Sequence, residues 1–316
     1  MKILVTGAAG FLGRRLIASL LAPDARQPIV SAIVAADLTE CAIADDRIRG
    51  YVGSVADEAF ARSIVETDVD VVYHLAAVLS GQAEAEFDAG MRVNVDGTRA
   101  LLDACRRLAR PPRFVFSSTI AVLGGPLPET VPEDQVVRPQ SSYGAEKSIG
   151  EVLVSEYSRR GFVDGVACRV PTVAVRPGRP NSALSSFVSG IIREPLAGQE
   201  SICPVPLDTR IWVSSPGTAT WNLAHAGRLA ASTLETGRVV NLPGLSVTPA
   251  DMLDCLGRLA GTAARARVRV DVDAQTARIV GSWPGAFDIR RALALGFRGD
   301  RDIDAVVTQF MAEERG

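Results

Sequence analysis

MKILVTGAAGFLG, residues 1–13, is the stretch that decides the fold. Its first part, Lys2–Thr6, is a short β-branched apolar run, which predicts a buried strand of a parallel sheet. Gly7, Gly10 and Gly13 follow at three-residue intervals, and the apolar stripe of a helix begins at Phe11. A strand, a glycine turn and a helix in this order present backbone N–H groups and a helix N-terminus to a phosphate. The stretch therefore predicts a nucleotide-binding turn.

The glycine positions and a later acidic residue indicate which nucleotide binds. A side chain at Gly7 or Gly10 would block the approach of the backbone to a pyrophosphate, and one at Gly13 would hold the helix off the strand. Asp37 ends the second predicted strand, 24 residues after Gly13, where a carboxylate accepts hydrogen bonds from the adenosine ribose. This carboxylate would repel a 2′-phosphate, and the two residues after it are uncharged. We therefore expect NAD, not NADP.

Strand and helix patterns alternate through the first half of the chain. After the first strand, strands are predicted at 29–36, 48–52, 69–75, 113–117 and 163–170, and helices at 84–110 and 142–160. This alternation predicts an α/β fold with a doubly wound parallel sheet of the Rossmann type. We expect residues 1–170 to form this domain, with 218–242 returning to it. Residues 171–217 and 243–316 then form a smaller C-terminal, substrate-binding domain.

Two further elements are predicted in this C-terminal part. Thr248 and Pro249 are typical of a helix N-cap followed by proline at the first helical position. Residues 267–273, with the sequence RVRVDVD, alternate like a half-exposed strand.

The composition of the chain argues against a nucleic-acid-binding protein, a membrane protein and a metalloenzyme. The 316 residues are 47% hydrophobic and 22% charged, with a formal net charge of −2. There is no polybasic run and no apolar run of bilayer length, so we expect neither a nucleic-acid nor a membrane partner. The five cysteines are scattered, which predicts reduced thiols and a cytoplasmic location. Two separated histidines and no carboxylate cluster predict no catalytic metal.

Hydroxyl groups and a lysine supply the candidate chemistry. Ser118 and Thr119 follow the strand predicted at 113–117, and Tyr143 and Lys147 are four residues apart, on one face of a helix. A free tyrosine has a pKa of about 10, which a neighbouring ammonium lowers. A phenol, an ammonium and a hydroxyl that holds the substrate oxygen form a proton relay between an alcohol and a carbonyl. A YxxxK pair alone also occurs by chance on solvated helix faces.

Taken together, these segments resemble the extended short-chain dehydrogenase/reductase family, which includes NAD-dependent epimerases and dehydratases. The resemblance rests on TGAAGFLG from Thr6, Asp37, HLAA at 74–77, NVDGT at 94–98, FSST at 116–119 and YGAEK at 143–147. It implies NAD as the cofactor and Tyr143 as the general acid/base. Lys147 would hold the ribose and lower the pKa of Tyr143, with Thr119 as the third catalytic residue and Ser118 beside it.

The same resemblance implies the cofactor contacts and the assembly. The cofactor residues would be Gly7, Gly10, Phe11, Leu12, Gly13, Asp37, Leu75, Ala76, Ala77, Asn94, Tyr143, Lys147 and Pro171. A homodimer would form through the helices at 84–110 and 142–160.

The segment from Arg176 to Gly198, RPGRPNSALSSFVSGIIREPLAG, indicates the substrate. It resembles the branch of the family that oxidises the C2 hydroxyl of a four-carbon sugar acid such as D-erythronate. A carboxylate substrate needs a cation, ideally a bidentate arginine. The candidate substrate-binding residues are Ser80, Thr119, Tyr143, Arg176, Asn181, Ser185, Arg193 and Arg210.

Two alternatives stay open at this point. A nucleotide-sugar epimerase or dehydratase on the same scaffold would reduce its NAD only transiently, although a dehydratase usually has an acid–base carboxylate pair where Ile120 and Ala121 stand. A cofactor-sensing regulator would bind NAD without turnover.

Overall fold

The computed structural model describes residues 1–22, 29–178, 184–234 and 237–314. The chain forms two compact units. The first comprises Met1–Thr119, Ser142–Arg169 and Thr220–Val240, and the second comprises Ile120–Ser141, Val170–Ala219 and Asn241–Gly316.

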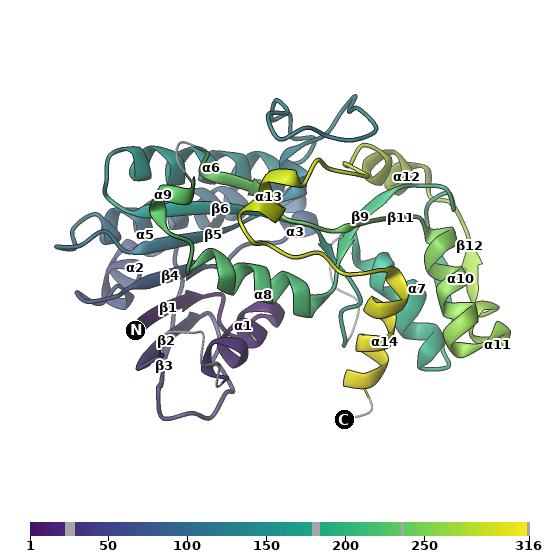
Figure 1. Cartoon of the computed structure of the whole chain (residues 1–316), viewed down its shortest axis with the longest axis horizontal. Coiled ribbons are helices and arrows are strands. Elements are labelled where there is room, and N and C mark those ends of the chain that lie inside the picture. Colours follow the sequence, from purple (N-terminus) through teal and green to yellow (C-terminus); the bar gives the residue numbers. More distant parts are fainter. Residues whose placement is uncertain (23–28, 179–183, 235–236, 315–316) are drawn as a thin grey trace. The chain divides into compact units, whose positions relative to one another are not determined.

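A seven-stranded sheet with the strand order β10-β6-β5-β4-β1-β2-β3 is the centre of the first unit (Figure 1). Its strands are β1 Lys2–Thr6, β2 Ala32–Asp37, β3 Ile48–Val52, β4 Val71–His74, β5 Arg113–Thr119, β6 Asp164–Val170 and β10 Val239–Asn241. β1 pairs in parallel with both β2 and β4, so the strand order reverses beside β1. This order confirms the predicted doubly wound Rossmann-type sheet, whose ligands bind where the order reverses.

Helices cover both faces of this sheet. They are α1 Phe11–Leu21, α2 Glu58–Ile64, α3 Ser80–Ala85, α4 Phe87–Gly90, the π-helix Met91–Asp96, α5 Gly97–Cys105, α6 Ser142–Arg159, α8 Pro216–Ala226 and α9 Ala231–Leu234. On one face, Phe116 of β5 packs with Leu101 of α5 and Val154 of α6. On the other face, the hydroxyl of Tyr73 donates to the carbonyl of Ala224 in α8 at 3.3 Å.

The prediction of one continuous helix over 84–110 is wrong. The chain leaves helical geometry at Glu86, winds as a π-helix over Met91–Asp96 and ends its last helix at Cys105. Asn94 in the π-helix and Thr98 in the first turn of α5 are buried polar side chains, and their partners are described below. The spacing of apolar residues does not reveal which distant groups these polar side chains bind, so it predicted one uninterrupted helix.

The second unit contains two small sheets and six α-helices among its described residues. β7 Thr172–Val173, β9 Ile211–Ser214 and β11 Leu245–Val247 form one sheet, and β8 Ser201–Cys203 pairs in parallel with β12 Val268–Val270. The helices are α7 Ser186–Leu196, α10 Pro249–Ala260, α11 Thr262–Arg265, α12 Ala274–Gly281, α13 Arg290–Ala294 and α14 Ile303–Glu313. Its core joins Ile191 of α7, Leu256 of α10 and Phe310 of α14.

Both elements predicted in the C-terminal part are present. Thr248 caps α10 by accepting a hydrogen bond from Asp251 N at 3.1 Å, and Asp251 Oδ2 accepts one from Thr248 N at 2.8 Å. This is a capping box with Pro249 at the first helical position. The strand predicted at 267–273 is shorter, Val268–Val270.

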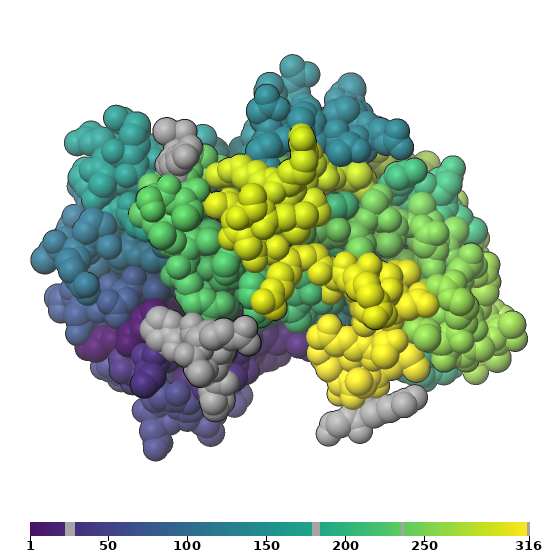
Figure 2. All heavy atoms as spheres, viewed as in Figure 1, coloured from purple at the N-terminus to yellow at the C-terminus, as the bar shows by residue number. Residues whose placement is uncertain are grey.

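Residues Ile120–Ser141 belong to the second unit, whereas the sequence pattern predicts that all of 1–170 lies in the nucleotide-binding domain. The segment starts with the short 3₁₀-helix Ile120–Val122, and much of it lies exposed, in blue-green at the top of Figure 2. It is anchored by apolar packing of Val122 and Val131 with Trp212 and Phe287. These partners are about 80 to 165 residues away in sequence, which is why the local pattern does not reveal them.

Candidate active site

The turn between β1 and α1 is so close that only glycine fits its main positions. Gly7 has φ +71°, and a Cβ there would lie 2.7 Å from Ala76 N. A Cβ on Gly13 would lie 2.1 Å from the carbonyl oxygen of Gly7. Gly10 occupies the N-cap position of α1, so no side chain caps the helix. Its first N–H groups suit an anion, and this backbone cradle fits the pyrophosphate of NAD.

Asp37 lies at the end of β2 and is held by the same turn. Its Oδ2 accepts a hydrogen bond from Ala9 N at 2.9 Å, and its Oδ1 accepts one from Leu38 N at 2.6 Å. Each carboxylate oxygen has further lone pairs, so the group can still accept hydrogen bonds from a ribose. Phe11 and Leu12, both half-buried, open the first turn of α1.

The segment after β4 lies against the glycine turn. Leu75 N donates to the carbonyl of Thr6 at 3.1 Å, and Ala76 N donates to Thr6 Oγ1 at 3.3 Å. Leu75, Ala76 and Ala77 are all half-buried. The structure therefore brings these three expected cofactor residues together with Gly7.

His74, the first residue of the HLAA motif, is fully buried inside a hydrogen-bonded chain. Its Nδ1 lies 2.7 Å from Thr6 Oγ1, and its Nε2 lies 2.9 Å from Thr98 Oγ1. Thr98 donates its own proton to the carbonyl of Asn94 at 2.7 Å, so Nε2 carries the ring proton. Burial lowers the pKa of His74 to about 3, which keeps the ring neutral. The ring ties β1 to the start of α5.

Asn94, expected to contact the cofactor, is engaged elsewhere. Its Nδ2 donates to the carbonyl of Val78 at 3.0 Å and to Glu146 Oε2 at 2.6 Å. Its Oδ1 accepts a hydrogen bond from Val78 N at 2.8 Å. Both amide hydrogens are thus used to hold the segment after β4 against α6, which gives Asn94 a positioning role.

α6 brings Lys147 beside Tyr143. Lys147 is fully buried, and its Nζ donates to the carbonyl of Ser117 at 3.0 Å. Nζ lies 4.7 Å from the centre of the Phe116 ring and 5.7 Å from that of the half-buried Tyr143. Burial lowers the pKa of Lys147 to about 8. An ammonium next to a phenol is the arrangement that a proton relay through tyrosine requires.

The two candidate hydroxyls at the end of β5 have different surroundings. Ser118 is buried, and its Oγ donates to Glu151 Oε1 at 2.6 Å. Glu151 in turn accepts two hydrogen bonds from Arg169, at 2.9 and 2.8 Å. The buried ion pair between Glu151 and Arg169 was not predicted from the sequence. Because Ser118 donates its hydroxyl proton to Glu151, that proton is not available to a substrate. Thr119 is half-buried and, as the next residue along the strand, points to the opposite face.

The expected substrate residues of the second unit differ in exposure. Arg193 is buried, with Nη1 donating to the carbonyl of Arg176 at 2.7 Å and Nη2 to Glu194 at 2.6 Å. It therefore fixes the chain at Arg176, which is itself half-buried. Ser185, half-buried, precedes α7, and Pro171 is buried. Asn181 lies outside the described residues; Ser80 opens α3 of the first unit.

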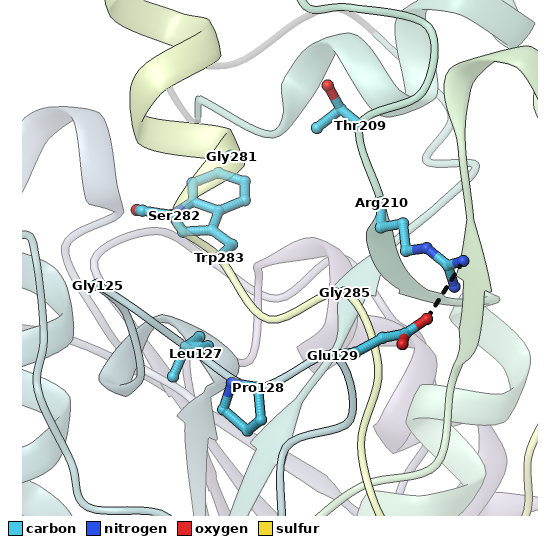
Figure 3. A pocket seen from close by; sticks show the side chains of 10 residues that line it. All are labelled: Gly125, Leu127, Pro128, Glu129, Thr209, Arg210, Gly281, Ser282, Trp283 and Gly285. Carbon is cyan, nitrogen blue, oxygen red and sulfur yellow. Dashed lines mark ion pairs between the residues drawn. The ribbon is translucent and has the colours of Figure 1, made fainter.

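Arg210 lines a pocket of about 280 Å³ in the second unit, shown in Figure 3. Its guanidinium pairs with Glu129 at 3.7 Å, and both side chains are exposed. Trp283, half-buried, forms another wall of the pocket and was not singled out from the sequence. A Cβ on Gly285 would lie 2.6 Å from Arg210 Cβ, so a larger residue at position 285 would clash with the Arg210 side chain.

Comparison with known proteins identifies the family. Residues 3–233 match the model of the NAD dependent epimerase/dehydratase family. The chain belongs to this family. It is 49% identical to a D-erythronate dehydrogenase from Cupriavidus necator, over 99% of this chain and 98% of that protein. It is 40% identical to a D-erythronate dehydrogenase from Haemophilus influenzae, over 98% of this chain and 99% of that one.

A solved structure has the same architecture. The crystal structure of a nucleoside-diphosphate-sugar epimerase from Agrobacterium tumefaciens superposes with a TM-score of 0.94 at 38% identity. The match covers 100% of this chain and 95% of that one.

Two further features of the described residues bear on membrane and metal chemistry. No helix in the described ranges has the length and apolar character needed to cross a membrane. Within 1–22, 29–178, 184–234 and 237–314, no three His, Cys, Asp or Glu side chains gather into a metal-binding group. All five cysteines are unpaired thiols; four are buried, and Cys41 is half-buried.

Proposed function

We propose that this protein oxidises the C2 hydroxyl of D-erythronate, or of a very similar four-carbon sugar acid, to the 2-oxo acid with NAD. The observation that carries the reaction type is the buried Lys147 ammonium 5.7 Å from the Tyr143 ring. The glycine turn that fits a dinucleotide supports the cofactor. The substrate is supported by two relatives, 49% and 40% identical over nearly the whole chain, that are named D-erythronate dehydrogenases.

In this proposal each residue has a defined task. The turn from Gly7 to Gly13 binds the pyrophosphate, and Asp37 binds the adenosine ribose. Leu75, Ala76 and Ala77 contact the cofactor from the segment after β4. Thr119 holds the C2 hydroxyl of the substrate, and the Tyr143 phenolate takes its proton. NAD⁺, when bound, supplies the hydride acceptor.

Lys147 makes this proton transfer favourable. Its ammonium stabilises the negative charge of the phenolate before the transfer, so Tyr143 can act as a base near neutral pH. The bond to Ser117 keeps the ammonium in place. Because the lysine is shielded from water, the attraction between the two charges is stronger than at a surface.

The carboxylate of the substrate would bind an arginine. Arg193 is buried, whereas Arg176 is half-buried and Arg210 is exposed, so Arg176 and Arg210 are the better candidates. Ser80, Ser185 and Asn181 would contact the substrate hydroxyls. Replacing Arg176 or Arg210 by lysine is expected to raise the KM for the acid by about tenfold at the residue that binds it, the cost of one charge-assisted contact. Unchanged KM values in both variants would contradict the proposed contact between the substrate carboxylate and one of these arginines.

The test is NADH formation by the purified protein. NAD⁺ is supplied with D-erythronate, L-erythronate, the two threonates, and a set of UDP- and GDP-sugars. Robust NADH formation with one four-carbon acid is the expected result. Absence of NADH with every acid would overturn the proposal.

A nucleotide-sugar epimerase remains the second candidate, because the Agrobacterium tumefaciens epimerase is 38% identical and superposes closely. Such an enzyme regenerates its NAD in each cycle. It would convert a UDP- or GDP-sugar in the same assay without net NADH. The higher identity to D-erythronate dehydrogenases favours the first candidate.

We further propose a cytoplasmic homodimer. The five unpaired thiols suit a reducing compartment. Apolar side chains are exposed on the helices expected at the interface: Phe87 is 59%, Ile149 39% and Val152 68% exposed. Light scattering should give twice the chain mass, and Val152→Asp should give the monomer. A monomeric wild-type protein at micromolar concentration would contradict the dimer.

A further inference from the structure

Glu146, the residue before Lys147, is a carboxylate around which three segments of the first unit are built. Its side chain is only 1% exposed. Its Oε2 accepts the hydrogen bond from Asn94 at 2.6 Å. A Cβ on Gly90, the last residue of α4, would lie 2.2 Å from its Oε1, so the glycine leaves room for this oxygen. α4, the π-helix and α6 therefore converge on one acidic group.

One oxygen of this carboxylate has no hydrogen-bond partner. Glu146 Oε1 is buried, and nothing in the described part of the chain donates to it. A half-satisfied buried carboxylate is costly unless an opposite charge compensates it. The next residue on α6 is the buried Lys147, whose ammonium lies near the Phe116 and Tyr143 rings and donates to the Ser117 carbonyl. The two buried charges interact electrostatically.

The other titratable groups around these two residues do not take over this interaction. Glu151 also acts on Lys147, but Arg169 holds its carboxylate through two hydrogen bonds. His74, on β4, is neutral. Glu84, on α3, acts on Glu146 and accepts a hydrogen bond from Ser142 N at 2.9 Å. Glu146 is thus the acidic neighbour of Lys147 that no arginine neutralises in the described structure.

We propose that Glu146 is a positioning residue for the reaction: its carboxylate, fixed by Asn94, keeps Lys147 in the ammonium form beside Tyr143. The catalytic part of this inference rests on the proposed function; the electrostatic part does not. Burial lowers the pKa of Lys147, and Glu146 is the largest of the influences that raise it again. In return, burial raises the pKa of Glu146, and the charge of Lys147 acts in the opposite direction.

Glu146→Gln separates charge from shape. The amide keeps an oxygen that can accept the Asn94 hydrogen bond, but the negative charge is lost. Loss of a nearby negative charge lowers the pKa of each neighbouring group that titrates. The pKa of Lys147 should therefore fall by at least half a unit, which is about a threefold weaker hold on the proton. The pH profile of kcat/KM should move to lower pH as a whole.

The sequence makes a direct measurement of Lys147 simple, because the chain has only two lysines, Lys2 and Lys147. Protein labelled with ¹³C at lysine Cε gives two NMR signals, which Lys2→Arg assigns. The Lys147 signal should titrate at lower pH in Glu146→Gln than in the wild type. Glu156→Gln is the matched control, since Glu156 lies on the same helix but is exposed and pairs with Arg159. Its Lys147 titration should equal that of the wild type.

Further variants keep the inference open to refutation. Glu146→Asp retains the charge and should recover most of the Lys147 pKa. Glu146→Met removes the charge without an amide, so a folded Glu146→Met protein gives the same test if the glutamine variant does not fold. An unchanged Lys147 titration in a folded charge-free variant would overturn the inference. Because this NMR measurement needs no substrate, its outcome is independent of whether D-erythronate is oxidised.

Discussion

At the residue scale, one lysine acquires its chemistry from its surroundings. Lys147 is buried near two aromatic rings and donates a hydrogen bond to the Ser117 carbonyl. Because little water lies around the ammonium, its electrostatic interaction with Tyr143 is only weakly screened. A lysine on a solvated helix face would be screened and would have little effect on a phenol. The distinction between a chance YxxxK pair and a proton relay is therefore one of burial.

The role of Tyr143 leads to a turnover prediction. Tyr143→Phe removes the base while leaving the ring, so turnover should fall by about a hundredfold or more. NAD affinity, measured by calorimetry, should stay nearly unchanged. Tyr157→Phe on the same helix is the control, because the Tyr157 hydroxyl donates to Asp103 at 2.8 Å, away from the relay. Loss of cofactor binding as the main effect of Tyr143→Phe would contradict the assigned role.

The close approach at Gly7 leads to a second prediction. Gly7→Ala forces a Cβ to within 2.7 Å of backbone at Ala76 and also strains a φ of +71°. NAD affinity should fall by about tenfold or more, since the turn must move away from the pyrophosphate. Gly261→Ala is the matched control: Gly261 has φ +86° but open space around its Cβ position. It should cost about 1–3 kcal/mol of stability, since its ψ of 167° completes a backbone conformation that is essentially restricted to glycine, and it should leave NAD binding intact.

At the scale of secondary structure, sequence signals succeeded where the determinant is local. β1, β3 and the start of α6 lie where the strand and helix patterns of the sequence predict. The single helix predicted over 84–110 was wrong, because this part of the chain contains buried polar residues whose partners lie outside it. Asn94 and Thr98 each bind groups that other strands or helices supply, and no local periodicity encodes those partners.

The capping box of α10 gives a prediction at this scale. Thr248→Ala removes the acceptor for Asp251 N, which leaves an N-terminal donor of the helix without its side-chain partner. The free energy of unfolding should fall by about 1 kcal/mol. Thr248→Ser keeps the oxygen and should match the wild type in urea denaturation. Equal stability of the alanine variant would show that the cap contributes nothing in this context.

At the scale of the whole molecule, buried His74 links stability to pH. Its pKa is about 3 in the folded protein against an ordinary 6.5, so between these values the unfolded chain binds more protons. Stability therefore falls as pH drops below about 6.5, by up to about 1.4 kcal/mol per pH unit from this group. Urea denaturation between pH 7 and pH 4.5 should show a steeper loss in the wild type than in His74→Gln. Parallel curves for the two proteins would contradict the assignment.

The sequence by itself determined the sheet, the nucleotide turn and the Tyr143–Lys147 pair, because each depends on neighbours within a few residues or one helical turn. It also indicated Asp37, whose place at the end of β2 follows from the strand pattern. The tertiary structure alone decided which polar groups are used up: Ser118 by Glu151, Asn94 by Val78 and Glu146, and Arg193 by Arg176 and Glu194.

The physical reason is range. Helix and strand formation respond to short-range spacing, whereas a buried polar side chain is defined by a partner that the fold brings from up to about 50 residues away in these cases. The same holds for the assignment of 120–141, whose apolar anchors Trp212 and Phe287 lie far along the chain. Burial of Glu146 beside Lys147 belongs with these features: their adjacency is written in the sequence, but only packing removes both charges from water and couples them.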